Sequence, residues 1–256
     1  DALSNPRRCP DATTPVSLNI RKDAMRILVT GAAGRVGSVV ARGLREHHQV
    51  RGHDRVPMPD LNDTIVSDLT DFDAILKATE DMDAVAHIGG LPGGNEWETI
   101  HQSNIIGTYN VFEACRQNGV KRVAYASRAG VLGHYPRSIT RTVEMVPTPV
   151  GHYTVSKVFA EALAYSYAHQ YDMGFVCVRI GNFKLERDQP EHPHQLSHGD
   201  CVRVFEQALT HPGVEYEVVF GVSASNWPLY DMEHGKRAIG YEPQDFADVP
   251  EEEWDK

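Results

Sequence analysis

The sequence predicts an α/β protein with a Rossmann-like doubly wound parallel sheet and a small C-terminal substrate cap. Short apolar runs alternate with segments of helical periodicity along most of the chain, which is typical of parallel strands joined by helices. The first apolar run ends in a glycine-rich turn, GAAGRVG at 31–37, directly before a helical segment. With 256 residues, 41% hydrophobic and 23% charged, the chain is long enough for one large domain or one domain with a small appendage.

Each expected element follows from its apolar pattern. Short apolar runs that end in glycine or polar residues predict buried strands at 25–30, 50–53, 64–66, 83–88, 122–126 and 175–180. Apolar residues at helical spacing predict helices at 36–47, 71–79, 97–118 and 152–170. After Gly181 the rhythm changes. A helix at about 199–209, a strand at about 215–220 and a helix at about 231–239 predict a small cap beside the sheet.

The domain organisation is predicted from the same patterns. Residues 1–24 contain three prolines and no apolar period, so we expect a flexible or vector-derived extension there. Residues 25–256 are expected to form a single Rossmann-fold domain, with residues about 181–248 contributing a small substrate-binding part.

Composition argues against several classes of partner. The net charge of −10 disfavours nucleic acid, since phosphate binding needs clustered Lys and Arg. No run of about 18 apolar residues occurs, so no membrane span is expected. The four cysteines are widely spaced, which favours reduced thiols in a cytoplasmic protein. His192, His194 and His198 lack carboxylate or thiol partners at motif spacing, so we expect no metal site.

The glycine turn predicts a dinucleotide site. Gly31, Gly34 and Gly37 allow a tight turn and close approach to a pyrophosphate, which the following helix N-terminus attracts. Asp54 ends the second strand, where a carboxylate binds the adenosine ribose and repels a 2′-phosphate. We therefore favour NAD, while Arg35 and Arg55 keep NADP open.

A second acidic residue follows the third strand. Asp68 either meets the adenine amino group or caps the next helix.

Tyr153 and Lys157 predict the chemistry. On a helix, residues four apart share a face, so the lysine lies beside the tyrosine ring. A neighbouring ammonium stabilises the phenolate, which then acts as general base in oxidation or as acid in reduction. The combination indicates hydride transfer at a carbon that bears oxygen.

These motifs resemble the extended branch of the short-chain dehydrogenase/reductase superfamily. The resemblance is carried by segments at 31–37, 87–90, 104–116, 126–133, 153–157 and 178–182, together with Asp54 and Asp68. Segments 220–226 and 239–243 are similar to the uronate dehydrogenases and NAD-dependent glucose-6-phosphate dehydrogenases. The resemblance implies NAD-dependent oxidation of a small sugar or sugar acid at its anomeric carbon. It also implies that Asn104 lies near the lysine and its water relay, and that a homodimer forms through the long helices 97–118 and 152–170.

We accordingly expect a single cofactor site at the carboxyl edge of the sheet. Its predicted residues are Gly31, Ala33, Gly34, Arg35, Val36, Gly37, Asp54, Arg55, Asp68, Leu69, Ile88, Gly89, Gly90, Tyr153, Lys157 and Ile180.

The chain departs from the resembled families at two places. Those families have a serine that hydrogen-bonds the reacting oxygen where this chain has Arg128, so Ser127 becomes the candidate hydroxyl donor. Arg128 either binds an anionic substrate group or faces solvent. The uronate enzymes hold the carboxylate with an arginine after the segment that corresponds to 179–182. The candidates here are Asn182, Arg187 and His194.

These departures leave two alternatives to a sugar dehydrogenase. One is a nucleotide-sugar epimerase or dehydratase with bound NAD. The other is a catalytically impaired dinucleotide-binding protein, because Arg128 replaces the expected serine.

Overall fold

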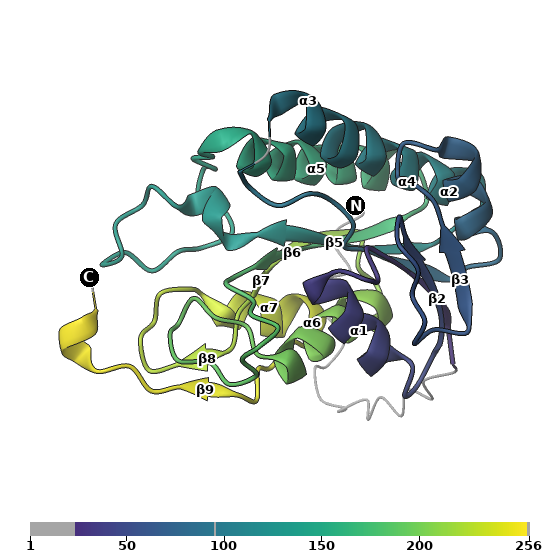
Figure 1. Cartoon of the computed structure of the whole chain (residues 1–256). Helices are drawn as coiled ribbons and strands as arrows, with labels where there is room; N and C mark the ends of the chain where they lie inside the picture. The colour runs from purple at the N-terminus through teal and green to yellow at the C-terminus, as the bar shows by residue number, and fades with distance from the viewer. Residues whose placement is uncertain (1–23, 95, 255–256) are drawn as a thin grey trace, which may run out of the picture.

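A seven-stranded parallel sheet forms the centre of the computed structural model, which describes residues 24–94 and 96–254 (Figure 1). The strands are β1 (Arg26–Thr30), β2 (Gln49–Asp54), β3 (Asp63–Val66), β4 (Ala84–His87), β5 (Arg122–Arg128), β6 (Gly174–Ile180) and β7 (Tyr216–Gly221). Their order is β3-β2-β1-β4-β5-β6-β7, and every pairing is parallel. The predicted doubly wound sheet is therefore confirmed. The order reverses between β1 and β4, where such sheets form a ligand crevice at their carboxyl edge.

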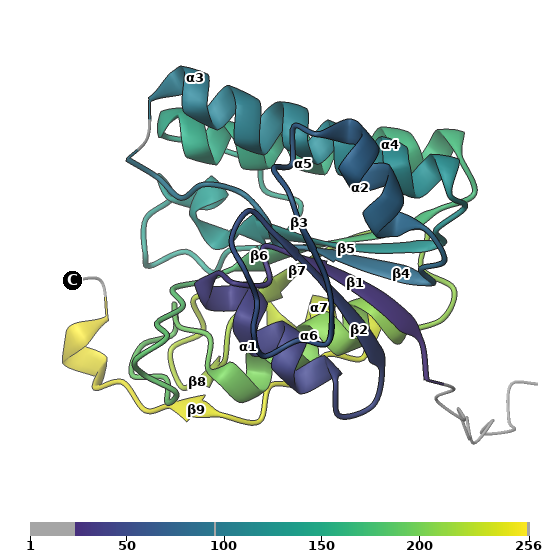
Figure 2. The same ribbon diagram turned by 45° about the vertical axis from the view of Figure 1, so that its right-hand side comes forward.

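Helices cover both faces of the sheet (Figures 1 and 2). One face carries α1 (Arg35–Leu44), α6 (His198–Thr210) and α7 (Met232–Ile239). The other carries α2 (Phe72–Thr79), α3 (Trp97–Ile100), the π-helix η1 (His101–Ile106), α4 (Gly107–Gln117) and α5 (Gly151–Gln170). Alternate side chains of the buried strands point to opposite faces, so two apolar clusters form, one under each helix layer.

The remaining elements are short. They are the 3₁₀ helices η2 (Ala129–Leu132) and η3 (Glu251–Glu253) and the strands β8 (Ala224–Ser225) and β9 (Phe246–Ala247), which pair with each other. A third apolar cluster, which includes Leu132, Trp227 and Tyr230, joins this region to the end of β7.

The expected cap is smaller than predicted. Helices α6 and α7 and strand β7 were expected in it, but β7 pairs along β6 from Tyr216 to Gly221 as the seventh strand of the sheet, and α7 packs against β7. Helix α6 packs against α1 on the sheet face. The physical reason is that β7 buries Val219 and Phe220, which continues the apolar face of the sheet. The apolar pattern changes after Gly181 because a long loop joins β6 to α6, and beyond this loop helices and strands alternate again.

Residues 97–117 are helical, as predicted, but they form two α-helical segments joined by a π-helical turn. This turn is the π-helix η1, which places Asn104 in a buried position. Among the described residues, no helix combines the length and apolar character needed to cross a bilayer. The predicted extension at 1–24 lies, apart from its last residue, outside the described residues.

Candidate active site

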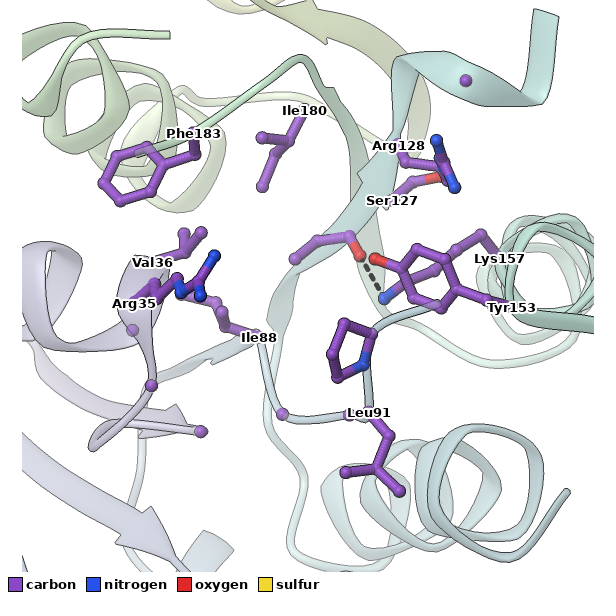
Figure 3. A pocket seen from close by; sticks show the side chains of 18 of the residues that line it. Arg35, Val36, Ile88, Leu91, Ser127, Arg128, Tyr153, Lys157, Ile180 and Phe183 are labelled. Carbon is purple, nitrogen blue, oxygen red and sulfur yellow. Dashed lines mark hydrogen bonds between the residues drawn. The ribbon is translucent and has the colours of Figure 1, made fainter. Parts of the chain in front are cut away.

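A cavity of about 1150 Å³ lies at the carboxyl edge of the sheet (Figure 3). It is lined by the turn between β1 and α1, by the ends of β2, β4, β5 and β6, and by the start of α5. All sixteen residues predicted to bind the cofactor line this one cavity. It is somewhat larger than the usual site for a drug-sized ligand, and so has room for a dinucleotide and a substrate.

The glycine turn has the geometry that a pyrophosphate requires. Gly31 has φ +69°, and a Cβ there would lie 2.7 Å from the Cα of Gly89. A Cβ on Gly37 would lie 2.0 Å from the Gly31 carbonyl oxygen, so only glycine lets the helix begin this close to the strand. Gly34 is the N-cap of α1 and supplies no side-chain cap. The first N–H groups of α1 are thus left for phosphate oxygens.

Asp54 is fixed at the end of β2 by the same turn. Its Oδ2 accepts a hydrogen bond from the Ala33 N–H at 3.0 Å, and its Oδ1 accepts one from Val56 at 3.4 Å. Arg35 and Arg55 line the same cavity as this carboxylate. The carboxylate therefore faces the region where an adenosine ribose would lie.

Asp68 is not the cap of the next helix. Its Oδ1 accepts hydrogen bonds from the N–H and the hydroxyl of Thr70, at 2.9 and 2.8 Å, in a local turn. These bonds lower the pKa of Asp68. The cap of α2 is Asp71, which accepts from the Ala74 N–H at 3.1 Å. Asp68 therefore remains a lining residue of the cavity.

Tyr153 and Lys157 enter the cavity from α5, opposite Arg35 and Val36 of the glycine turn (Figure 3). The Lys157 Nζ donates to the Ala126 carbonyl oxygen at 2.7 Å and lies 5.5 Å from the centroid of the Tyr153 ring. The Arg128 guanidinium lies 5.2 Å from the same centroid and donates to the Thr154 hydroxyl at 3.2 Å. Two cationic groups therefore flank the phenol ring.

Burial and nearby charges shift the pKa values of Tyr153 and Lys157. Burial raises the pKa of Tyr153, and the positive charge of Arg128 opposes the increase. Burial, reinforced by Arg128, lowers the pKa of Lys157 to about 7, while the carboxylate of Glu161 opposes this decrease. The sequence predicted Lys157 as the side chain whose charge favours the phenolate. In the structure Arg128 is a second positive group beside the ring, and its charge acts to lower the pKa of Tyr153.

Ser127 points toward a buried ion pair. Its hydroxyl donates to Glu161 Oε1 at 2.6 Å. Arg179 also donates to this carboxylate, from Nε at 3.0 Å to Oε1 and from Nη2 at 2.9 Å to Oε2. The sequence predicted that the Ser127 hydroxyl donates to the reacting oxygen of the substrate. In this arrangement the hydroxyl proton is instead donated to Glu161. The Arg128 guanidinium occupies the space that a side chain on Gly130 would fill, with Nη2 at 2.4 Å from that Cβ position.

Asn104 holds the loop that follows β4. Its Oδ1 accepts from the Leu91 N–H at 2.8 Å, and its Nδ2 donates to the Leu91 carbonyl oxygen at 2.9 Å. Nδ2 also lies 3.3 Å from the hydroxyl of Ser156, the residue before Lys157. The contacts of Asn104 therefore fix the cavity wall beside Tyr153 and Lys157.

The predicted substrate residues divide into two groups. Arg128, Asn182 and His194 line the cavity. Arg187 does not line it and instead pairs with Glu191. The three histidines that we considered for a metal have different partners: His194 bonds the Tyr230 hydroxyl, His192 contacts Trp227, and His198 meets the Lys184 carbonyl oxygen.

Comparison with known proteins identifies the family. A family model described as the NAD dependent epimerase/dehydratase family matches residues 27–216. The chain belongs to this family. This assignment confirms the predicted resemblance and NAD as the cofactor.

Curated relatives and solved structures agree with the family assignment. A uronate dehydrogenase of Pseudomonas syringae pv. tomato is 34% identical over 230 residues, which cover 88% of this chain and 83% of the relative. An NAD-dependent glucose-6-phosphate dehydrogenase of Haloferax volcanii is 31% identical over 86% of this chain and 93% of its own length. A mutant uronate dehydrogenase from Agrobacterium tumefaciens, solved in complex with NAD, has a TM-score of 0.82 at 32% identity and covers 88% of this chain and 86% of its own.

Two arginines are among the lining residues that the sequence analysis did not identify. Arg137 and Arg141 line the cavity from the segment between η2 and α5. No helical or strand period marks this segment. One signal was available: residues 134–143 contain two arginines and no acid, although the chain as a whole carries a net charge of −10.

Proposed function

We propose that this member of the family is an NAD-dependent oxidoreductase that oxidises a sugar or sugar acid by hydride transfer. One observation carries the proposal. The Tyr153 phenol, flanked by Lys157 and Arg128, lines the same cavity as the uncapped N-terminus of α1. A general base and a dinucleotide site are thereby brought together, as dehydrogenation of an alcohol requires.

The residues of the chain have separable roles in this proposal. Bound NAD supplies the hydride acceptor. The Tyr153 oxygen accepts the proton of the substrate hydroxyl, and Lys157 and Arg128 stabilise the phenolate by their charge. The Ala126 carbonyl holds the Lys157 Nζ in place, so the positive charge is positioned before the substrate arrives. Ile88, Ile180 and Val36 give the cavity an apolar wall that helps to exclude water (Figure 3).

Turnover of NAD with a panel of aldoses, uronates and sugar phosphates tests the proposal. We expect net formation of NADH with at least one of them, and a loss of about 10²- to 10⁴-fold in kcat for Tyr153→Phe. Affinity for NAD, measured by equilibrium titration, should change little. Tyr165→Phe is the matched control, because Tyr165 lies on the same helix but is 51% exposed and does not line the cavity.

Two other results would contradict the proposal. Conversion of a nucleotide sugar without net NADH would indicate an epimerase. NAD binding without turnover of any panel member would indicate a protein without this activity.

We further propose a homodimer formed through α4 and α5. These helices lie beside each other in the outer layer (Figure 2) and expose three apolar side chains, Tyr109, Val155 and Tyr165. Covering these side chains from water favours association. Sedimentation velocity should give twice the chain mass, and Val155→Glu combined with Tyr165→Glu should halve it. A monomer at micromolar concentrations of the unaltered protein contradicts the proposal.

We also propose that the protein works in the cytoplasm. Cys115, Cys177 and Cys201 are buried free thiols, which supports a reducing compartment. Fractionation of cells that produce the protein tests this, and recovery outside the cytoplasmic fraction would contradict it.

A further inference from the structure

Three arginines converge on one wall of the cavity. Arg128 comes from the end of β5, and Arg137 and Arg141 come from the segment between η2 and α5. The Tyr230 hydroxyl bonds the His194 ring, and the Arg141 guanidinium lies 5.6 Å from the centroid of the Tyr230 ring. Burial raises the pKa of Tyr230 to about 12, and the charges of all three arginines oppose this increase. Burial and these charges lower the pKa of His194 to about 4, which keeps its imidazole neutral near pH 7.

Arg141 is the buried member of the group. Its side chain is almost wholly inaccessible, with the residue 3% exposed. Nη1 lies 3.2 Å from the Tyr230 hydroxyl, and Nη2 donates to the Tyr135 carbonyl oxygen at 3.1 Å. Its Nε is buried and has no hydrogen-bond partner among the described residues. One N–H of this buried guanidinium is therefore unpaired within the described part of the chain.

The backbone holds Arg141 in place. Its N–H donates to the Leu229 carbonyl oxygen at 2.9 Å, and its own carbonyl accepts from the Asp231 N–H at 2.9 Å. These bonds form an isolated parallel bridge between Arg141 and Tyr230. The guanidinium is thus preorganised at the cavity wall, which reduces the entropy lost when a ligand binds.

Nothing in the described part of the chain neutralises these charges. The ion pairs between described residues include none with Arg128, Arg137 or Arg141. Arg179 shows the contrast, because it is equally buried but bonded to Glu161 through two nitrogens. A buried cation without a counter-ion is strongly disfavoured. Its retention beside a cavity points to an anion that arrives with the substrate.

We propose that Arg128 and Arg141 form an anion-binding subsite, with Arg137 at its rim, that holds a carboxylate or phosphate of the substrate. The proposal rests on the proposed function and narrows its substrate class to anionic sugars. Planar guanidinium groups bind both oxyanions through paired N–H donors. Because Arg128 also lies against the Tyr153 ring, the anion is held close to the general base.

A comparison of three substrates tests the subsite. D-Glucose, D-glucuronate and D-glucose 6-phosphate share a reacting carbon but differ in charge. We expect kcat/KM with NAD to be at least about tenfold higher for one of the two anionic sugars than for D-glucose. The preferred anion identifies the group as carboxylate or phosphate. Equal kcat/KM for all three would overturn the proposal.

Substitutions of the arginines test whether these residues cause the preference for an anionic sugar over D-glucose. Arg141→Lys keeps the charge but removes the planar group, and we expect it to raise KM for the anionic substrate about 10- to 100-fold. Its kcat for that substrate and its kcat/KM for D-glucose should change less than about threefold. Arg137→Ala, at an exposed position, should have a smaller effect that decreases with added salt.

Arg122→Lys is the matched control. Arg122 also donates to backbone carbonyl oxygens and has no ion-pair partner in the described ranges, but it does not line the cavity. It should leave all three substrates unaffected. Equal losses in Arg122→Lys and Arg141→Lys, or an equal loss for D-glucose and the anions, would overturn the subsite.

Binding separates this proposal from the proposed function. Calorimetric titration of the full chain with D-glucuronate and with inorganic phosphate needs no turnover. We expect binding of at least one anion, weakened about tenfold or more by Arg141→Lys. Anion binding without NADH formation would refute the dehydrogenase activity but support the subsite. NADH formation that depends on none of the three arginines would support the dehydrogenase activity but refute the subsite. If Arg141→Lys fails to fold by circular dichroism, calorimetric titrations of Arg128→Met and Arg137→Ala provide the same binding comparison without relying on turnover, because Arg128 also acts on the Tyr153 phenol.

Discussion

Replacing Lys157 with methionine removes a buried cation. Its charge stabilises the Tyr153 phenolate but lowers the stability of the folded protein. The residue is 4% exposed, and burial, reinforced by Arg128, lowers its pKa from the usual 10.5 to about 7. At 1.36 kcal/mol per pKa unit, this difference means that the charged form destabilises the folded state by about 5 kcal/mol.

The net effect of Lys157→Met is smaller than this. Methionine fills a similar volume but leaves the Ala126 carbonyl oxygen without its donor, which costs about 1 to 3 kcal/mol. We therefore expect a net gain of about 2 to 4 kcal/mol near pH 6, or about 5 to 10 °C in Tm for a chain of this size. Activity should be lost in the same variant, because the phenolate loses a neighbouring charge.

The gain should depend on pH in a defined direction. The folded pKa of Lys157 is depressed below its unfolded value, so between about pH 7 and 10.5 the unfolded chain binds more protons than the folded one. Stability of the unaltered protein attributable to this group therefore rises with pH across that window. The advantage of Lys157→Met is largest below pH 7 and shrinks toward pH 10.

Thermal unfolding followed by circular dichroism from pH 6 to pH 10 measures this directly. Lys77→Met is the control, because Lys77 is exposed on α2 and carries no burial penalty, so its Tm should change by less than about 2 °C. A Lys157→Met protein that melts below the unaltered one at pH 6, or whose advantage is the same at pH 10, refutes the reasoning.

Three further substitutions probe the cofactor site and the buried ion pair. Asp54→Ala should lower the ratio of kcat/KM for NAD to that for NADP by about tenfold or more, since the carboxylate no longer repels a 2′-phosphate; an unchanged ratio would contradict the assignment. Gly37→Ala places a Cβ 2.0 Å from the Gly31 carbonyl oxygen and should weaken NAD binding about tenfold or more in equilibrium titration, and undiminished affinity would count against the turn as the phosphate site. Glu161→Gln leaves the buried Arg179 uncompensated and should lower the free energy of unfolding by about 3 to 5 kcal/mol in urea titration, whereas a loss below about 1 kcal/mol would show that the pair is unimportant.

Local pattern was sufficient to predict most of the sheet and the cofactor wall. Short apolar runs located the first six strands, because a strand buried on both faces has few alternatives. The glycine turn and Asp54 were found because their backbone geometry requires particular residue types at a fixed spacing. The strand β7 was located in the sequence but placed in the cap, since its position depends on pairing with β6 across more than thirty residues.

The substrate side of the site could not be predicted in the same way. The orientation of Ser127 depends on the position of Glu161 on α5, a contact between residues 34 apart in the chain. Arg141 lies in a segment without periodicity, and its burial results from a backbone bridge to Tyr230, 89 residues later. Arg187 was one of several candidates because it follows the segment at 179–182, yet its side chain pairs with Glu191 outside the cavity.

The contact between Asn104 and Leu91 has a consequence for ligand traffic. One amide side chain holds both the N–H and the carbonyl oxygen of the same loop residue, so moving the loop at that point requires breaking two hydrogen bonds together. Beyond Leu91 the chain reaches Gly93 and Gly94, and a side chain at Gly94 would meet no atom within 4 Å. The half of the loop next to β4 is therefore held in place by these two hydrogen bonds. We expect any movement of the loop that admits or releases a nicotinamide to occur in the half that contains Gly93 and Gly94.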